Sequence, residues 1–422
     1  MRSVEEQLSR VTASAVAPRP VRVAISEAQG LLCAEEVVAS EPLPSFDQAA
    51  IDGYAVRSVD VIDAGEIAGD DTEAPGERIV LVLPVVGEIS AGDRTPTRLQ
   101  PHQAVRVETG APLPTLADAV VPLRWTDGGV SKVRVGHGVS SGDYVRRAGD
   151  DVQAGDVAVR TGTVIGPAQV GLLAAVGRGR VLVHPRPRLS VISVGAELVD
   201  IDRTPGQGQV YDVNSYALAA AARDAGADVH RVGIVDREAA SLREVVEGQL
   251  IRSEIVVISG PVGGAASQAI VDALADLGEL SIDRIAMHPG SVQGFGRLGR
   301  DEVPTFLVPA NPVSALVAFE VMIRPLIRIA LGKRQPMRRI VRARTVGPIV
   351  SVKGRRGYLR GQLMRDEQTG DYLVQVLGES ETGSSHLLAG LAEANCLVLV
   401  DPEDEELRTG DEVDVAFLAL RG

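Results

Sequence analysis

Aromatic residues and lysine are scarce in this sequence. Only 3% of the 422 residues are Phe, Trp or Tyr, so the hydrophobic cores must be built from Val, Leu, Ile and Ala. Lysine occurs only at positions 132, 333 and 353, and the remaining basic residues are arginine. We interpret the shortage of lysine as a coding bias towards a GC-rich genome.

Cysteine is almost absent as well. The two cysteines, Cys33 and Cys396, are far apart in the sequence, and neither has a metal-ligand companion at short spacing. Two cysteines cannot cross-link a chain of this length into a disulfide-stabilised fold, so a reducing compartment fits. We therefore expect a cytoplasmic protein.

Long apolar segments and excess positive charge are also missing. No run of about 18 or more apolar residues occurs, so we expect no membrane insertion. The first residues, MRSVEEQLSR, lack the apolar segment of a signal peptide, and we expect none. The formal charge is 43 − 56 = −13, which repels phosphate polymers and argues against nucleic-acid binding.

The length favours three or four domains. Apolar spacing predicts a helix over residues 3–16, which a capping box of Ser3 and Glu6 would start. A second helix is expected near 26–36, with Ser26 as its cap.

The residue pattern of the sequence then changes twice. In residues 47–140, short segments of alternating apolar and polar residues are interrupted by Gly, Pro and Asp, which predicts a small β-rich domain. Residues 141–178 return to turns and a helical stretch, and we expect them to pack with residues 1–46. The β-rich second domain would then be an insertion in a discontinuous, largely helical first domain.

Residues 179–332 form the predicted third domain, an α/β domain. Nearly all-apolar strands between amphipathic helices indicate a parallel sheet that is covered on both faces. The predicted strands are 188–194, 228–235, 254–259, 280–287 and 304–309, and the predicted helices are 214–225, 238–252, 265–277 and 313–331. The fourth domain, 333–422, has short strands and turns and should be a small β-barrel or sandwich.

Ligands of parallel sheets bind beyond the carboxyl ends of the strands, which makes four loops informative. These loops are 195–213, 260–267, 288–294 and 309–312. Their candidate ligand-binding residues are Glu197, Gly260, Gly263, Gly264, Gln268, His288, Gly290, Ser291, Pro309, Asn311 and Pro312.

Each of these loops also has a purely structural interpretation. The glycines allow a ligand to approach the backbone N–H groups at a helix N-terminus, but close helix–sheet packing explains them about as often. Asn311 can bind a ligand or cap the following helix. For Asp212 and Asn214, helix capping is the favoured interpretation.

Two further strings carry candidate carboxylates. Residues 42–57, PLPSFDQAAIDGYAVR, form a proline-stiffened turn that ends in Asp52 beside Gly53. Residues 146–155, RRAGDDVQAG, place Asp151 in a turn after two arginines. Taken singly, an Asx turn and a solvated charged turn explain these strings.

Together, these strings resemble the MoeA/gephyrin E-domain family over essentially the whole chain. The segment around Asp52 resembles the family's Asp-Gly-Tyr-Ala-Val signature, residues 104–112 its Thr-Gly-Ala-Pro motif, and residues 310–315 its Gly-Asn-Pro-Val-Ser-Ala loop. The resemblance implies a homodimer of four-domain subunits. The family's active site lies between the α/β domain of one subunit and the β-rich lid domain of the other.

The resemblance also implies a reaction and its participants. The family takes adenylylated molybdopterin and molybdate with a divalent cation such as Mg²⁺, hydrolyses the adenylate and leaves molybdenum on the dithiolene. Asp52, Asp151 and Glu197 match catalytic acidic positions of the family, and Glu197 and Asp52 are the candidate cation ligands.

Several positions depart from the family pattern. Ala196 and Gln268 replace two aspartates, and both lysines of the family's Lys-Pro-Gly-Lys-Pro loop are replaced, by His288 and Ser291. Each lost cation at a phosphate site would forfeit roughly 1.5–3 kcal/mol of charge-assisted bonding. An acidic position of the family is also replaced, by Arg237.

Three hypotheses follow from this pattern. The first is a homodimeric scaffold with an eroded molybdopterin site, which binds a short peptide tail of a cytoskeletal or cell-division protein. By the gephyrin precedent Glu5 and Leu8 would face that tail, although the simpler interpretation makes Leu8 a core residue and Glu5 a solvated one. The second is an active molybdopterin molybdenumtransferase in which His288 and arginines elsewhere replace the lysines. The third is binding of a pterin without chemistry.

Overall fold

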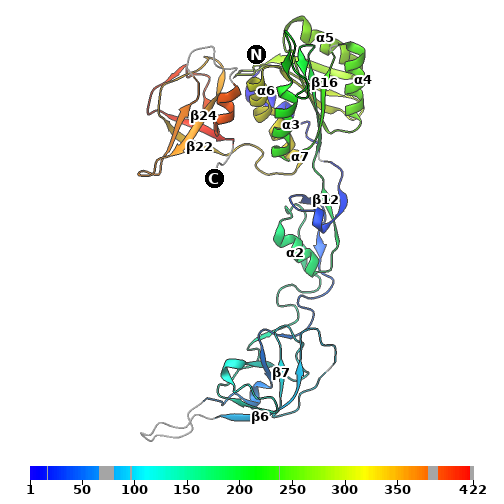
Figure 1. Cartoon of the computed structure of the whole chain (residues 1–422), viewed down its shortest axis with the longest axis vertical. Helices are drawn as coiled ribbons and strands as arrows, with labels where there is room; N and C mark the ends of the chain where they lie inside the picture. Colours follow the sequence, from blue (N-terminus) through cyan, green and yellow to red (C-terminus); the bar gives the residue numbers. More distant parts are fainter. Residues whose placement is uncertain (17, 66–79, 96, 237, 379–387, 419–422) are drawn as a thin grey trace. The chain divides into compact units, whose positions relative to one another are not determined.

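The computed structural model describes residues 1–422 except 17, 66–79, 96, 237, 379–387 and 419–422. Position 237, which departs from the family pattern, therefore lies outside the described residues. The chain forms two compact units, Arg22–Leu182 and a larger unit of Met1–Val21 with Val183–Gly422 (Figure 1). No helix in the described part of the chain is both long enough and apolar enough to cross a membrane.

The smaller unit contains a five-stranded sheet in the order β8-β5-β7-β6-β9. Side chains alternate across it, so that Tyr54 and Val56 enter one core whereas Ala55 enters a second core on the opposite face. The strands are β5 (Gly53–Val56), β6 (Leu81–Ile89), β7 (Ala104–Val107), β8 (Ala119–Pro122) and β9 (Lys132–Val135). The β-rich character predicted for this segment is confirmed.

The rest of the smaller unit consists of short pairings and one helix. The helical stretch predicted within residues 141–178 is present as α2 (Pro167–Ala175), but the predicted helix near 26–36 is wrong. That segment holds only one 3₁₀ turn, Ile25–Glu27, because it then enters strand pairing at Leu32–Cys33. The other strands are β1 (Val21–Ala24), β2 (Leu32–Cys33), β3 (Val37–Val38), β4 (Gln48–Ala49), β10 (Val145–Arg146), β11 (Val157–Val159) and β12 (Arg180–His184).

The larger unit is built on a six-stranded sheet in the order β16-β13-β17-β21-β20-β18. The first four strands are parallel, as predicted, whereas β20 runs antiparallel to both of its neighbours. The strands are β13 (Arg188–Val194), β16 (Asp228–Val235), β17 (Ile255–Gly260), β18 (Gly278–Arg284), β20 (Val292–Leu298) and β21 (Val303–Pro309). The sheet is therefore mixed, and the predicted loop 288–294 is wrong in its second half, which begins β20.

Helices cover both faces of this sheet (Figure 1). One face packs against α3 and the continuous α6–α7 helix, and the other packs against α4 and α5. The bounds are α3 (Val213–Ala225), α4 (Ala239–Leu250), α5 (Gly264–Leu274), α6 (Pro312–Ala318), a π-helical turn (Phe319–Ile323) and α7 (Arg324–Ala330).

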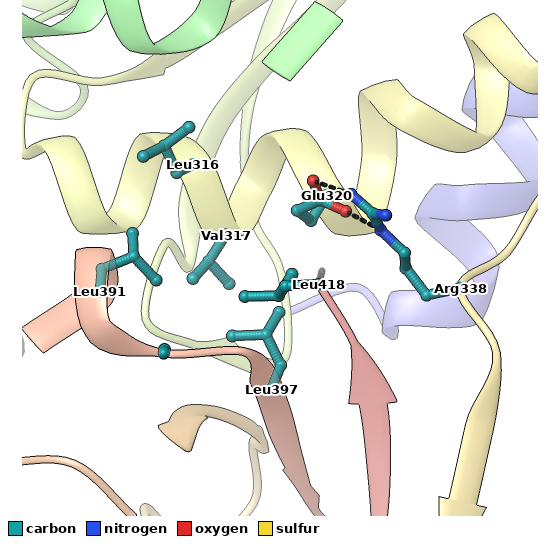
Figure 2. Close-up of a pocket in the computed structure, with 8 residues that line it drawn as sticks. Leu316, Val317, Glu320, Arg338, Leu391, Leu397 and Leu418 are labelled. Carbon is teal, nitrogen blue, oxygen red and sulfur yellow. Dashed lines mark hydrogen bonds and ion pairs between the residues drawn. The ribbon is translucent and has the colours of Figure 1, made fainter. Parts of the chain in front are cut away.

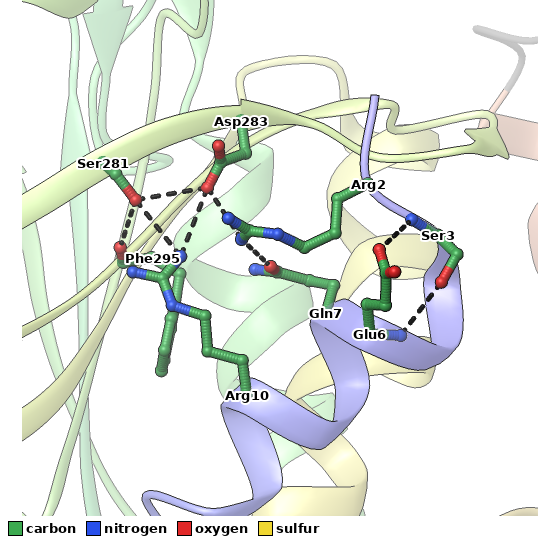
Figure 3. A network of polar contacts seen from close by, with 8 residues as sticks. All are labelled: Arg2, Ser3, Glu6, Gln7, Arg10, Ser281, Asp283 and Phe295. Atoms are coloured by element: carbon green, nitrogen blue, oxygen red, sulfur yellow. Dashed lines mark hydrogen bonds and ion pairs between the residues drawn. The ribbon is translucent and has the colours of Figure 1, made fainter.

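The N-terminal helix α1 (Val4–Thr12) belongs to the larger unit. The predicted capping box is present, since Glu6 N donates to Ser3 Oγ and Ser3 N donates to the Glu6 carboxylate, both at 3.1 Å (Figure 3). Arg2 donates to Asp283 of β18 at 2.9 Å, and Arg10 lies 5.2 Å from the ring centroid of Phe295. These contacts hold α1 against the α/β sheet, whereas the sequence assigned it to the first domain.

The C-terminal part is a small closed β-barrel. Its ring runs β24–β25–β22–β28–β26 and closes because β24 also pairs with β26. The strands are β22 (Ile340–Thr345), β24 (Arg356–Arg365), β25 (Tyr372–Val376), β26 (Cys396–Val400) and β28 (Glu412–Phe417), with β19 (Met287–His288) added to β24 and the short pair β23 (Ile349–Val350) and β27 (Glu406–Leu407) beside them. Helix α8 (Leu388–Glu393) packs near β24.

The observed architecture is thus multi-domain α/β with a β-rich domain and a C-terminal barrel, as predicted. The four-domain boundaries at 46/47, 140/141, 178/179 and 332/333 stay predictions, because the chain divides only into two units.

Candidate functional site

At the carboxyl ends of the parallel strands, the connections change from one face of the sheet to the other, and we call this position the switch point. Strand β13 is followed by α3 on one face of the sheet, whereas β17, its neighbour, is followed by α5 on the other face. In open α/β sheets, ligands bind at such a switch point, beyond the carboxyl ends of the strands. The loops after Val194 and Gly260 flank this position.

Glu197 lies just past the end of β13. Its backbone is fixed by β14 (Leu198–Val199) pairing with β15 (Val210–Tyr211), and Val210 N donates to Glu197 O at 2.8 Å. Its carboxylate folds back over Gly195, since a β-carbon built there would lie 2.8 Å from Glu197 Oε1. The strand end therefore presents a half-buried carboxylate, as a ligand site on this edge requires.

Asp212 is the N-cap of α3, which confirms the capping interpretation for this residue. It is 1% exposed, and its carboxylate accepts hydrogen bonds from Ser193 Oγ at 2.7 Å, from Ser215 N at 3.0 Å and from Ser215 Oγ. Ser193 is on β13, so this network fixes the start of α3 to the strand that precedes it.

Asn214, the second residue of α3, joins three segments at the same edge. Its Nδ2 donates to Ser259 Oγ at 2.7 Å and to Ala310 O at 2.8 Å, which lie at the ends of β17 and β21. Its Oδ1 is buried and accepts no hydrogen bond from the described residues. Sequence reasoning gave Asn214 only a capping role, because its partners are 45 and 96 residues away and have no local signal.

The glycine loop after β17 packs tightly at Gly260, and the helix that follows it, α5, begins without a side-chain cap. A β-carbon on Gly260 would lie 3.3 Å from Val194 O, and Gly263 and Gly264 adopt positive φ angles of 95° and 72°. Ser267 accepts a hydrogen bond from Gly263 N at 2.9 Å. Packing thus favours glycine at 260, and the positive φ angles favour glycine at 263 and 264. The predicted ligand role for Gly260, Gly263 and Gly264 stays a prediction.

Gln268 is bonded within its own helix. Its Nε2 donates to Asp272 Oδ1 at 2.8 Å, one turn further along α5. Its amide oxygen is the atom left to face a ligand. A neutral oxygen is a weaker cation ligand than the aspartate that the family pattern has at this position.

The 288–291 loop lies beside the end of β21, because β20 starts there with Gly294 opposite Leu307. His288 itself is in β19 and pairs with Gly357 of the barrel. Burial and the nearby Arg355 lower the pKa of His288 below its usual 6.5, which favours the neutral ring. The replacement of a family lysine by protonated His288 stays a prediction.

The two other loop residues have backbone roles. Gly290 has a φ of 86°, and a β-carbon there would lie 3.0 Å from Ser314 O of α6. Ser291 O accepts a hydrogen bond from Ile285 N at 2.7 Å. Gly290 thus allows the loop to approach α6 closely, and Ser291 ties the loop to the segment after β18.

Asn311 caps α6 and Pro312 is its first residue. The Asn311 side chain accepts a hydrogen bond from Ser314 N at 3.0 Å, and Pro309 is the last residue of β21. Of the two interpretations of Asn311, capping is therefore observed. Its side-chain nitrogen is still available to a ligand.

The carboxylate predicted in the β-rich domain occupies a turn of the smaller unit. Asp52 Oδ1 accepts hydrogen bonds from Thr109 N and Thr109 Oγ1, both at 2.7 Å, and these bonds lower the pKa of Asp52. The side chain is exposed and ionised at neutral pH, as a ligand carboxylate requires.

Asp151 is also exposed in the smaller unit. Its backbone N donates to Leu43 O at 3.0 Å, while the preceding residue, Asp150, closes the turn by accepting from Arg147 N. Its carboxylate has no bonded partner in the described chain, so its catalytic role stays a prediction.

No three His, Cys, Asp or Glu side chains gather as a metal site anywhere in the described ranges. Mg²⁺ usually takes only one or two protein carboxylates and fills its shell with water and substrate phosphate. The role of Glu197 and Asp52 as cation ligands stays a prediction.

Glu5 and Leu8, the two predicted partner-binding residues, lie on α1. The Glu5 carboxylate pairs with Arg356 of β24, and Leu8 packs against the core of the α/β domain. The simpler interpretation of Leu8 as a packing residue is therefore observed, whereas Glu5 bridges α1 and the barrel rather than being only solvated.

A separate hollow of about 190 Å³ lies between the α6–α7 helix and the barrel (Figure 2). Apolar side chains from both parts line it, and an ion pair of Glu320 with Arg338 closes one side at 2.8 Å. Its residues come from the middle of the long helix and from β26 and α8. This hollow is therefore distinct from the switch point at the ends of β13 and β17.

Three family models match consecutive parts of the chain. They are the MoeA N-terminal region (domain I and II) over residues 2–177, a probable molybdopterin binding domain over 190–329, and the MoeA C-terminal region (domain IV) over 342–418. A molybdopterin molybdenumtransferase 1 of Mycobacterium tuberculosis is 71% identical, and the match covers 100% of both chains. This chain belongs to the MoeA family.

Other relatives agree with this assignment. A molybdopterin molybdenumtransferase 2 of the same organism is 37% identical over 98% of this chain and 99% of its own length. Among solved structures, the molybdopterin biosynthesis MoeA protein of Pyrococcus horikoshii is 29% identical, with a TM-score of 0.80 and 98% coverage of both chains. The family resemblance read from the sequence is confirmed.

Proposed function

We propose that this chain is a molybdopterin molybdenumtransferase, the second of the three hypotheses that the sequence allowed. The observation that carries the proposal is the 71% identity, over the full length of both chains, to a protein with that name. The scaffold hypothesis drew on the departures from the family pattern alone, and none of these relatives supports it or its cell-division partner. We therefore do not carry it forward.

The described residues supply several parts that the reaction needs. The switch point at the ends of β13 and β17 takes the molybdopterin, with the backbone N–H groups of the glycine loop and the α6 N-terminus directed at its phosphate. The carboxylate of Glu197 orients a divalent cation, which would neutralise charge on the phosphate and on molybdate when bound. The cation and the homodimer of the family remain part of this proposal.

Asp52 is the residue of the β-rich domain that takes part in the reaction. Two hydrogen bonds from Thr109 fix its carboxylate and keep it ionised. In the reaction the bond between AMP and the molybdopterin phosphate is hydrolysed, AMP leaves, and molybdenum binds the two dithiolene sulfurs. A fixed carboxylate can orient the water or the metal oxyanion for these steps.

The proposal is tested by incubating the purified full-length chain with adenylylated molybdopterin, with and without molybdate. We expect molybdate-dependent release of AMP, and a fall of about a hundredfold to a thousandfold in Asp52→Ala. The matched control is Asp93→Ala, since Asp93 is an exposed aspartate of the same unit that accepts a hydrogen bond from Thr95 N at 2.9 Å. Absence of AMP release above the blank would refute the proposal.

Complementation gives a second, independent readout. A strain that lacks its own molybdenum-insertion enzyme should regain growth on a molybdoenzyme-dependent substrate when it expresses this chain. The Asp93→Ala variant should restore growth as well, and Asp52→Ala should not.

A further inference from the structure

One arginine of the β-rich domain is held between aromatic rings. The Arg124 guanidinium carbon lies 5.0 Å from the ring centroid of Trp125 and 5.8 Å from that of Tyr144. Arg124 Nη2 also donates to Tyr144 Oη at 3.2 Å. His137 stacks on Trp125 at 4.2 Å between ring centroids with an interplanar angle of 21°, which helps to fix the indole.

The sheet register places this cluster at the same end of the sheet as Asp52. Gly53, the residue after Asp52, is opposite Pro122 in the β5–β8 pairing, and Arg124 follows Pro122 by two residues. Gly53 is also opposite Val107 of β7, and Thr109 follows Val107 by two residues. Arg124 and the Asp52–Thr109 turn thus both extend from one end of the sheet.

Arg124 has unused hydrogen-bonding capacity. A guanidinium has five N–H donors, and only the one to Tyr144 is used within the described chain. No carboxylate of the described residues lies within ion-pair distance of it, whereas Arg57 at the other end of β5 is paired with Asp60 at 3.9 Å. Packing on the aromatic rings accounts for the position of the exposed guanidinium, but it leaves the remaining N–H donors directed to solvent.

An exposed guanidinium that aromatic rings hold in place, and that no carboxylate of the described residues pairs with, has the properties of an oxyanion site. A planar guanidinium binds tetrahedral oxyanions through two parallel N–H donors. The cluster therefore offers an oriented cation at the Asp52 end of the β-rich sheet.

We propose that Arg124, oriented by Trp125 and Tyr144, binds a tetrahedral oxyanion of the substrate at the Asp52 end of the β-rich domain. This inference rests on the proposed function, which brings Asp52 to the substrate and Arg124 with it. The oxyanion is either the phosphate of the adenylate or molybdate, since both present the same tetrahedral oxygens. Arg124 is therefore a substrate-binding residue that the sequence did not single out.

The chain carries its own probe for this site. Trp125 is the only tryptophan, and the Arg124 guanidinium lies over its ring. An anion bound to Arg124 would therefore change the electrostatic environment of the indole. Titration of the purified full-length chain with AMP, inorganic phosphate and molybdate, followed by tryptophan fluorescence, should give a saturable change. Comparison of the three anions identifies which oxyanion the site takes.

The variants define the outcome. Arg124→Gln should weaken binding of the responding anion about tenfold to a hundredfold, and Arg124→Lys should weaken it less because it keeps the charge. The matched control, Arg57→Gln, should bind as the unmodified chain does. Calorimetry repeats the comparison without relying on the indole.

Two results would overturn the inference. One is equal affinity of Arg124→Gln and the unmodified chain, and the other is the absence of saturable binding of all three anions. Failure of the proposed function looks different, because it would abolish AMP release while leaving Arg124-dependent anion binding intact. If AMP is released, Arg124→Gln should raise KM for adenylylated molybdopterin or molybdate, with a smaller effect on kcat.

Discussion

Thr109 fixes the carboxylate of Asp52 through two hydrogen bonds. Asp52 Oδ1 accepts one from the backbone N–H and one from the hydroxyl of Thr109, both at 2.7 Å. Both bonds favour the ionised carboxylate and lower the pKa of Asp52 below its ordinary 3.8. The stabilisation is present above that ordinary pKa and is lost as the pH falls through the folded-state value.

We expect Thr109→Val to raise the pKa of Asp52, because it removes the hydroxyl donor and keeps the backbone donor. An NMR titration of the side-chain carboxyl carbons measures the change. Thr95→Val beside Asp93 is the control and should leave Asp52 unchanged. An unaltered Asp52 titration in Thr109→Val would contradict the hydrogen-bond explanation.

Asp212→Ala should destabilise the larger unit by about 2–4 kcal/mol. The substitution removes an N-cap, and it leaves buried Ser193 and Ser215 without their acceptor. Urea denaturation of the full chain gives the change. Asn311→Ala removes only a cap from α6 and should cost about 1 kcal/mol, so equal losses in the two variants would argue against the buried network.

His288 should make the larger unit sensitive to acid. Its pKa is lowered in the folded state, so the unfolded chain binds the proton more readily and stability falls as the pH drops below about 6.5. His288→Asn should reduce the difference in Tm between about pH 8 and pH 5.5. The control is His102→Asn, whose side chain is 78% exposed, and a pH dependence unchanged in His288→Asn would refute the assignment.

The two cysteines should be unreactive in the folded chain. Both are fully buried, and burial raises the pKa of Cys396 to about 12 and that of Cys33 above its ordinary 9.0. We expect no reaction with a thiol reagent near pH 8 in buffer and two equivalents in denaturant. Rapid modification of either thiol under native conditions would show that its burial is not maintained.

Glu320→Ala should destabilise the junction between the long helix and the barrel by about 2–3 kcal/mol. The Glu320 side chain is 13% exposed and accepts two hydrogen bonds from Arg338, at 2.8 and 3.0 Å, and it also lies 3.6 Å from buried Arg324 (Figure 2). Removing the carboxylate leaves buried Arg324 without its carboxylate partner, and it leaves Arg338 with only the exposed Asp224, at 3.1 Å.

The matched control is Asp276→Ala. Its ion pair with Arg243 is 2.7 Å long, but its side chain is 73% exposed, and such pairs contribute less than about 1 kcal/mol. Thermal denaturation of both variants separates burial from simple charge removal. Similar losses in the two variants would be incompatible with the explanation by burial.

Strand β20 illustrates why some elements could not be predicted. Its sequence, VQGFGRL, has two glycines and an internal polar residue, which locally favour a loop. A β-carbon on Gly296 would lie 2.0 Å from Glu279 O, and one on Gly294 would lie 2.7 Å from the Leu307 side chain. The glycines therefore serve close strand packing, which depends on neighbours that are distant in sequence.

The sequence by itself determined the family, the alternation of strands and helices in the α/β part, and the caps at Ser3 and Asp212. These features depend on periodicity, on bonds within one turn, and on motifs in a fixed order, all of which are local. Only the tertiary structure decided the rest. It brought together segments that are far apart along the chain: the three segments that Asn214 joins, the strands β24 and β26 that close the barrel, the surroundings that lower the pKa of His288, and Arg124 with the Asp52 turn. These features depend on distant segments because burial and strand register are properties of the folded whole.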